Sequence, residues 1–299
     1  MRRFSTYVQV PLSSIKELRG TNIFIRHRES VEKLLNNIFR DGAKHLHVIT
    51  DYDFTITKHT LDNGEPTPSS FELFKNCPSV PEDYRTMTHK FKKIYKKAEL
   101  DTSLPKQLRE KYMRDWWTKA SNITKGFPFH EQELLDMAER YKYSLRDNVE
   151  DMFKTLHDRM IPCLIFSAGL GNTVHAMLKL IHATNKNESL LKNTEHYKLL
   201  EGRANVILMG DTLTDIEMAE GMKHNNVLKI GFIPNAIAKE NLCEFVKAYD
   251  IILVDHSSMK VPNAILYLSY SPPMHHFVAK AGCNSTQIER RGEDVNNGN

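Results

Sequence analysis

Two aspartates one residue apart, Asp51 and Asp53, follow directly on a short apolar run at 45–50. Such a run is typical of a buried strand, so both carboxylates would lie at the carboxyl end of that strand. Ligands of open α/β sheets bind at this end, and the two side chains can converge once the chain turns into a loop. A solvated turn is the alternative, because Asp is also a common turn residue. This stretch alone favours neither interpretation.

Hydroxyl and carboxylate groups also follow two other apolar runs. Ser167 comes directly after the run at 161–166, where a hydroxyl and nearby backbone N–H groups could bind an anion. Asp211 and Asp215 follow the next such run and would add two carboxylates at the same edge of a sheet. Taken singly, Ser167 and Asp215 also suit helix N-caps, and Lys186 suits an ordinary surface. All of them in this order are much harder to explain by chance.

Strands and helices alternate along most of the chain, which predicts a mostly parallel, doubly wound α/β sheet. Short apolar runs mark the expected strands, at 45–50, 161–166, 205–209, 226–230 and 251–254. Apolar residues at helical spacing mark the helices of this alternation, at 29–41, 147–160, 174–181, 187–200, 214–220 and 237–246. Residues 1–27 are expected to be irregular, with one possible strand at 6–10.

The segment at 58–145 interrupts this alternation with helical patterns. A loop is expected at 58–80, which is rich in Pro, Asn, Asp and Ser. The helices predicted after it lie at 81–100, 105–123 and 130–142. Because the segment is inserted after the first site-bearing strand, it should form a helical cap over the site.

The predicted domain organisation is a core domain of 1–57 and 146–272 with a cap domain of 58–145. The basic stretch at 90–97 lies at helical spacing on the cap and is interpreted as a solvated face. The polar tail at 273–299 is expected to be disordered.

Composition is that of an ordinary globular protein of 299 residues, with 40% hydrophobic and 26% charged residues. A net charge of +4 is too small to indicate nucleic-acid binding, and no segment reaches membrane-spanning length. The cysteines are far apart without metal-type spacing, which favours a reducing compartment. We therefore expect a cytoplasmic monomer that acts on a small molecule, with no nucleic-acid or membrane partner.

The series Asp51-x-Asp53-x-Thr55, Ser167, Lys186 and Gly210-Asp211-x-x-x-Asp215 resembles the four motifs of the haloacid dehalogenase superfamily of phosphotransferases. The residue types suit that chemistry, because a phosphoryl group carries negative charge that a metal ion, a lysine and hydroxyl donors can stabilise. The resemblance implies that Asp51 is the nucleophile, forming an aspartyl-phosphate intermediate, and that Asp53 is the general acid/base.

The same resemblance implies a set of residues around the phosphate. It gives Mg²⁺ as the cofactor, with Asp51, Asp53 and Asp211 as its ligands. It assigns phosphate binding to Thr55, Ser167, Ala168 and Lys186. Asp215 would orient the site from behind the metal ligands.

Several longer stretches narrow the resemblance to the cytosolic type III 5′-nucleotidases. They include 165–171, 228–232 and 249–254, and the likeness runs from about residue 5 to 270. This resemblance implies a nucleoside 5′-monophosphate substrate. The family dephosphorylates pyrimidine nucleoside monophosphates, and one branch prefers 7-methylguanosine monophosphate.

Residues that would contact the base follow from the same resemblance. Glu99 matches a cap glutamate of the family that contacts the base. The sequence Trp116-Trp117-Thr118-Lys119-Ala120 looks like the methylguanosine branch, because the pyrimidine branch tends to carry Tyr and Ser at positions 117 and 120. Methylation makes guanine cationic, and Trp is the best cation–π partner, so the substrate-binding set is Glu99, Trp117 and Ala120. Trp116 lies on the apolar row of its helix, which favours a place in the core over contact with the base.

The chain departs from the family between Ser167 and Lys186. The family has a helix, a further strand and a loop there, whereas only 18 residues intervene here, so one outer strand is expected to be missing. A helix that leaves the catalytic edge covers about 15 Å in ten residues, so Lys186 would have to reach the site along a rebuilt path.

Two hypotheses of different class follow from this departure. The first is a working Mg²⁺-dependent 5′-nucleotidase. The second is a shortened variant that binds metal and nucleotide without efficient turnover. A third interpretation, an aspartate that accepts phosphate as a signalling switch, is disfavoured by the large helical cap, which serves to enclose a small substrate.

Overall fold

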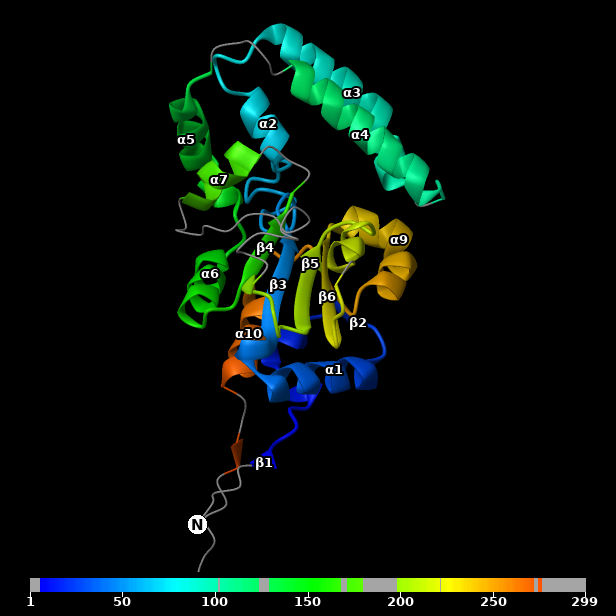
Figure 1. Ribbon diagram of the computed structural model, residues 1–299, viewed down its shortest axis with the longest axis vertical. Helices are drawn as coiled ribbons and strands as arrows, with labels where there is room; N and C mark the ends of the chain where they lie inside the picture. Colours follow the sequence, from blue (N-terminus) through cyan, green and yellow to red (C-terminus); the bar gives the residue numbers. More distant parts are fainter. Residues whose placement is uncertain are drawn as a thin grey trace, which may run out of the picture.

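A six-stranded sheet lies at the centre of the computed structural model, with helices on its faces and more helices above one edge (Figure 1). The structure describes residues 6–101, 103–123, 129–167, 171–179, 198–220, 222–271 and 274–275. The strand order is β2 (Ile23–Ile25), β7 (Ile251–Val254), β6 (Asn226–Ile233), β5 (Asn205–Gly210), β3 (Leu46–Asp51) and β4 (Cys163–Phe166). Neighbouring strands are parallel except β2 and β7. The predicted mostly parallel α/β sheet is confirmed.

Strand register brings the predicted site residues to one edge of the sheet. Thr50 on β3 pairs with Met209 on β5, so Asp51 and Asp211 leave neighbouring strands within one residue of the same level. Asp51 also pairs with Phe166, the last residue of β4, which places the next residue beyond the same edge. The carboxyl ends of three strands therefore converge there.

Two hydrophobic layers cover the sheet, since successive side chains of a strand point to opposite faces. Val48 belongs to the layer on one face, and its neighbour Ile49 belongs to the layer on the other. The helices that pack on the Val48 side are α1 (Arg28–Asp41), α6 (Val149–Asp158) and α10 (Lys260–Tyr270). On the Ile49 side, the α-helix that packs against the sheet within the described part of the chain is α9 (Asn235–Ala248). Burial on both faces explains why the central strands are apolar runs without alternation.

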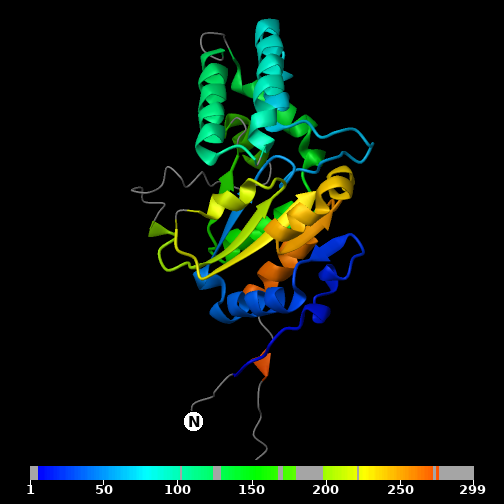
Figure 2. The same ribbon diagram turned by 90° about the vertical axis from the view of Figure 1, so that its right-hand side faces the viewer.

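The α-helices of the inserted segment at 58–145 lie above the carboxyl edge, with α7 (Gly171–Lys179) beside them, and we refer to those of the inserted segment as the cap helices (Figures 1 and 2). They are α2 (Ser70–Lys75), α3 (Glu82–Leu100), α4 (Lys106–Ile123) and α5 (Glu131–Arg140). In both views α3 and α4 run side by side as a long pair. The sequence predicted α3, α4 and α5 to within two residues at each end, whereas the domain boundaries at 57/58 and 145/146 stay predictions.

Helix α2 corrects the prediction of an uninterrupted loop at 58–80. It begins with a capping box, in which the Ser69 side chain accepts a hydrogen bond from the Glu72 N–H and the Glu72 carboxylate accepts one from the Ser69 N–H. The Ser-x-x-Glu signal is present in the sequence, but a six-residue helix is too short to show a helical period. Strand β2 and helix α10 were also not predicted, and β2 is only three residues long.

Other elements differ from the sequence expectation in length or type. Helix α7 (Gly171–Lys179) begins three residues earlier than expected, and η5 (Asp215–Ala219) is a 3₁₀ helix rather than an α-helix. The further 3₁₀ helices are η1 (Leu12–Ser14), η2 (Lys16–Leu18), η3 (Ala43–His45) and η4 (Lys142–Ser144). The helix predicted at 187–200 lies mostly outside the described residues.

The two ends of the described chain form a small sheet of their own. Strand β1 (Thr6–Tyr7) pairs with β8 (Met274–His275) in antiparallel fashion. Two residues of the tail are thus ordered against the start of the chain, and the rest of the tail prediction lies outside the described residues.

Strand β4 lies at one edge of the sheet among the described strands. This position agrees with the expected loss of an outer strand. The segment at 180–197 is outside the described residues, so the loss itself stays a prediction.

The two segments that join the cap helices to the sheet pair with each other. The Lys58 N–H donates to the Ser144 carbonyl at 2.7 Å, and the Arg146 N–H donates to the Ile56 carbonyl at 3.0 Å. Lys58 Nζ also forms an ion pair with Asp147, with 3.1 Å between nitrogen and oxygen. The connection is therefore a short ribbon of two hydrogen-bonded segments, 56–58 and 144–146, rather than two independent linkers.

Arg146 fastens this ribbon to the loop that follows Asp51. Its side chain is buried and donates to the carbonyls of Thr55 at 2.7 Å, Phe54 at 2.6 Å and His256. The guanidinium also lies over the Phe232 ring, 4.2 Å from its centre. Burial lowers the pKa of Arg146 to about 9, although the nearby Asp211 opposes that shift, so the group stays charged at neutral pH.

We predict that Arg146→Met lowers the free energy of unfolding by about 3 kcal/mol, because several buried carbonyls lose their donor. Urea denaturation of the purified protein measures this loss. Arg40→Met is the matched control, since Arg40 is exposed and its ion pair among the described residues is with its neighbour Asp41, and it should change stability by less than about 0.5 kcal/mol. Equal effects of the two substitutions would contradict the role given to Arg146.

Candidate active site

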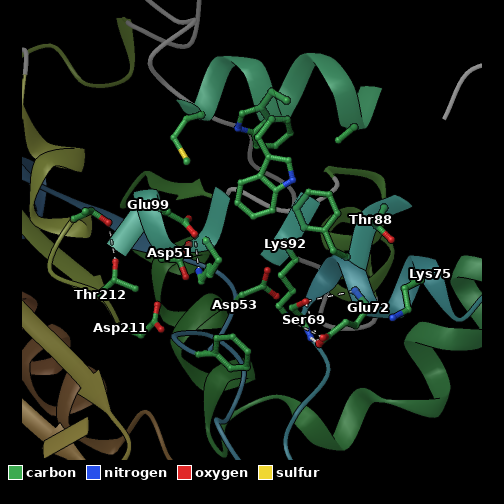
Figure 3. A pocket seen from close by; sticks show the side chains of 18 of the residues that line it. Asp51, Asp53, Ser69, Glu72, Lys75, Thr88, Lys92, Glu99, Asp211 and Thr212 are labelled. Carbon is green, nitrogen blue, oxygen red and sulfur yellow. Dashed lines mark hydrogen bonds and ion pairs between the residues drawn. The ribbon is translucent and has the colours of Figure 1, made fainter. Parts of the chain in front are cut away.

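A cavity of about 490 Å³ lies between the carboxyl edge of the sheet and the cap helices (Figure 3). The core contributes Asp51, Asp53, Asp211 and Asp215, and the cap helices contribute aromatic and charged side chains. The lining residues from the cap helices and the segment before them include Ser69, Phe71, Glu72, Lys92, Lys96, Glu99, Trp116, Trp117 and Ala120. One end of the cavity is therefore acidic and the other aromatic.

Buried carboxylates crowd the acidic end. Burial raises the pKa of Asp51 well above its usual range, and repulsion from Asp215, Asp211 and Asp53 adds to that rise. The pKa of Asp211 is likewise well above its usual range, chiefly through burial and then through Asp215. Without a compensating cation these groups resist ionising together.

The loop after β5 is fixed by the side chain of Asp215. Its Oδ2 accepts hydrogen bonds from the backbone N–H groups of Asp211 at 2.9 Å and Thr212 at 2.8 Å. Gly210 makes this turn possible, because a Cβ there would lie only 2.4 Å from the Cβ of Asp215. The Tyr249 hydroxyl donates to the Thr212 carbonyl from the other side. This arrangement supports the predicted role of Asp215 in orienting Asp211.

Asp53 is held by the first residue of α2. Its Oδ1 accepts a hydrogen bond from the Ser70 N–H and its Oδ2 accepts one from the Ser70 hydroxyl, both at 2.7 Å. Burial raises the pKa of Asp53, and the two bonds from Ser70 oppose that rise. The orientation of this carboxylate thus depends on where a cap helix begins.

The turn after Asp53 has an unusual backbone. Phe54 has a φ of +64°, in the left-handed region, and its N–H donates to Thr57 Oγ1 at 2.8 Å. Its ring stacks on His59 with 5.2 Å between centroids. Burial lowers the pKa of His59 to about 4, so the ring is neutral at pH 7, and its Nε2 lies 3.1 Å from the Phe232 carbonyl. The turn is therefore stabilised both by the stacking of the Phe54 ring on His59 and by the hydrogen bond of the Phe54 N–H.

The predicted phosphate-binding residues are placed unequally. Thr55 is fully buried and does not line the cavity, and its Oγ1 has no hydrogen-bond partner among the described residues. Ser167 lies at the correct edge, after the register partner of Asp51, but it does not line the cavity either. Ala168 and Lys186 lie outside the described residues.

The predicted base-binding residues all line the cavity: Glu99, Trp117 and Ala120. Trp117 is 44% exposed and faces Phe71 on α2, with 6.1 Å between ring centroids. Trp116 also lines the cavity, and it stacks on Tyr95 at 5.8 Å. The two tryptophans therefore differ, since Trp116 is packed against Tyr95 whereas Trp117 is open to a ligand.

The structure adds residues that the sequence analysis assigned elsewhere. The basic stretch at 90–97 is largely exposed, as predicted, but Lys92 and Lys96 also line the cavity, which the sequence did not indicate. Ser70 and Phe71 lay in a predicted loop. Their signal was the capping box of α2, which places the following side chains in a first helical turn.

One ion pair connects the cap helices to the sheet edge. Arg109 Nη2 on α4 lies 2.7 Å from Glu217 Oε1 on η5. The side chains are 13% and 35% exposed, so the pair is partly screened from solvent. Because η5 follows the loop of Asp211, this contact fixes α4 relative to the acidic end of the cavity.

Comparison with known proteins decides the family. The family model described as Pyrimidine 5′-nucleotidase (UMPH-1) matches residues 54–180 and 177–269, which together are well over half of the chain. The chain belongs to the pyrimidine 5′-nucleotidase family. It is therefore a 5′-nucleotidase, a hydrolase.

Named relatives and a solved structure agree with this family. The chain is 33% identical to the 7-methylguanosine phosphate-specific 5′-nucleotidase of Drosophila melanogaster, over 89% of this chain and 93% of that protein. It is 26% identical to the human protein of the same name, over 93% and 98% of the two chains. The crystal structure of cytosolic 5′-nucleotidase IIIB bound to cytidine superposes with a TM-score of 0.80 at 30% identity, over 87% of this chain and 97% of that chain.

The match to the 5′-nucleotidase family falls into two segments that meet at residues 177–180. This break lies between Ser167 and Lys186, in the interval where the sequence predicted a lost strand. Asp211 lies within the second matched segment, whereas Asp51 and Asp53 lie just before the first.

For this 5′-nucleotidase we predict that Arg109 and Glu217 are coupled. Arg109→Ala and Glu217→Ala should each raise the KM for a nucleoside monophosphate several-fold, and the double variant should be no worse than either single variant. The expected coupling is about 1 kcal/mol, as for a partly exposed ion pair. Steady-state kinetics of the four proteins measures it, and strictly additive effects would contradict the contact.

Proposed function

We propose that this 5′-nucleotidase is Mg²⁺-dependent and hydrolyses nucleoside 5′-monophosphates through an aspartyl-phosphate on Asp51. The observation that carries the proposal is a single cavity that joins buried carboxylates at the sheet edge to an aromatic pocket under the cap helices. The acidic end suits a metal-assisted phosphoryl transfer, and the aromatic end suits a nucleobase. We place the reaction in the cytoplasm with a monomeric enzyme, and we expect no nucleic-acid or membrane partner.

The donor set fits magnesium. No three His, Cys, Asp or Glu side chains form a ready-made metal cage within the described residues. Mg²⁺ needs no such cage, because it binds through one or two carboxylates together with water and phosphate oxygens. Asp51 and Asp211 would supply those carboxylates. The sequence resemblance also gives Asp53 as a ligand; its oxygens each accept one hydrogen bond from Ser70 and keep a second lone pair, and we assign this carboxylate to proton transfer as well.

Bound Mg²⁺ would neutralise charge on the phosphoryl oxygens and allow the clustered carboxylates to ionise. An Asp51 oxygen then attacks phosphorus, the bond to the ribose O5′ breaks, and Asp53 gives a proton to O5′. In the second step Asp53 takes a proton from water, whose oxygen attacks the phosphoryl group, and phosphate leaves Asp51. Ser70 holds Asp53 in reach of the leaving oxygen throughout, and Asp215 holds the loop of Asp211.

The base would lie at the aromatic end, between Glu99 and Trp117. The Drosophila and human relatives are named for 7-methylguanosine phosphate, and the solved structure holds cytidine. We favour 7-methylguanosine monophosphate, because its cationic ring gains cation–π energy against Trp117 and its N–H edge can donate to Glu99. A ring stacked between Phe71 and Trp117 needs about 7 Å, so these two side chains must separate slightly when the base enters.

The second candidate is the shortened variant that binds nucleotide and metal with little turnover. The observation that favours it is the break in the family match at 177–180, close to where Lys186 follows. Loss of a strand at the sheet edge would leave β3 and β5 in place, so metal and base binding would survive while phosphate neutralisation suffered. Turnover measurements separate the two candidates.

We predict that the purified protein releases phosphate from 7-methylguanosine monophosphate and from cytidine monophosphate in the presence of Mg²⁺. Asp51→Asn should lower kcat by at least about 10³-fold, because the nucleophile is lost. A colorimetric phosphate assay measures both. Tight nucleotide binding by the unsubstituted protein without phosphate release would instead support the shortened, non-catalytic variant.

Trp117→Ala should weaken the binding of 7-methylguanosine monophosphate more than the binding of cytidine monophosphate. We expect KM to rise roughly tenfold for the cationic base and roughly threefold for cytidine, because both lose stacking but only the former loses a cation–π contact. Steady-state kinetics with both substrates measures the ratio, and Trp117→Phe should restore part of it. Equal changes for the two substrates would argue against base recognition by Trp117.

A further inference from the structure

Lys96 belongs to a stripe of α3 that faces the cavity. Thr88, Lys92, Lys96 and Glu99 all line it, at the spacing of four, four and three residues that places side chains on one face of a helix. Lys96 Nζ lies 2.7 Å from Glu99 Oε2, and the side chains are 44% and 23% exposed. The ammonium is thus held inside the cavity by the proposed base-binding residue.

The two lysines of this stripe have different surroundings. Lys92 Nζ is 2.9 Å from the Glu72 carboxylate on α2, with its side chain 58% exposed. Lys96 pairs with Glu99 instead, and it lines the same cavity as Asp53 and Asp211. Its ammonium therefore faces a space that the base-binding residue and the carboxylates of the sheet edge share.

The space between the acidic and aromatic ends of the cavity is where the phosphate of a bound nucleotide must lie. A phosphate dianion next to several aspartates requires cations around it, and a metal ion alone leaves some of its oxygens uncompensated. We propose that Lys96 is a phosphate-binding residue carried by the cap, which turns from Glu99 toward the phosphate oxygens when the nucleotide binds. This inference rests on the proposed function. It adds a phosphate-binding lysine on the cap helix α3, whereas the sequence motifs place such a lysine, Lys186, in the core.

A cation on α3 has a structural consequence. The phosphate would be bound by the sheet edge on one side and by Lys96 on the other, so the substrate itself would draw α3 toward the core. A lysine that only held Glu99 in place would serve the base instead, and it would not distinguish a nucleotide from its nucleoside. That difference makes the two roles separable.

Lys96→Met tests the proposal, with Lys93→Met as the matched control. Lys93 is exposed on the same helix and does not line the cavity, so both variants lose one charge from α3 but only one changes the cavity. Isothermal titration calorimetry with Mg²⁺ present gives the Kd of inorganic phosphate and of the nucleoside for each protein, and kinetics gives KM for the nucleotide.

For Lys96→Met we expect the Kd of inorganic phosphate and the KM of the nucleotide to rise roughly tenfold, while the nucleoside Kd changes less than twofold. Lys96→Arg should restore most of the loss, and Lys93→Met should match the unsubstituted protein. An unchanged phosphate Kd would overturn the proposal, as would an equal loss of nucleoside and nucleotide affinity. The binding measurements need no turnover, so they decide the role of Lys96 even if the unsubstituted protein releases no phosphate.

Discussion

Repulsion among buried carboxylates is the constraint on which the site depends. Asp51 and Asp211 leave neighbouring parallel strands within one residue of the same level, and Asp215 is drawn in behind them because it must hold the Asp211 loop. The cluster is unfavourable in the protein alone, as the raised pKa of each group indicates. A site that concentrates negative charge in this way is suited to bind a divalent cation and, through it, a phosphate.

The cap helices complete the site as well as cover it. Ser70 at the start of α2 orients Asp53, and Arg109 on α4 is tied to η5 beside the Asp211 loop. Arg146 fixes the connection between the two parts to the turn after Asp51. The orientation of Asp53 and the shape of the aromatic pocket are therefore mechanically linked, because displacement of the cap helices would disturb both.

The sequence predicted those parts of the site that follow buried strands. Asp51 and Asp211 could be located because β3 and β5 are continuous apolar runs that parallel pairing brings together. Ser70 and Lys96 could not be located from the sequence, because the direction of a side chain on a short or amphipathic helix depends on what the helix packs against. Lys96 in particular looked like one of several solvated lysines, and only the tertiary arrangement distinguishes it from Lys93. Ala168 and Lys186 stay predictions.

Calorimetric titration of Mg²⁺ into the nucleotide-free protein tests the central claim most directly. If the carboxylate cluster is the metal site, one ion should bind per chain, and binding should release protons, because the cation lowers pKa values that burial and repulsion had raised. Repeating the titration in buffers of different ionisation enthalpy measures those protons, and Asp211→Asn should abolish binding. The absence of Mg²⁺ binding at millimolar concentrations, or binding that survives Asp211→Asn, would contradict the account.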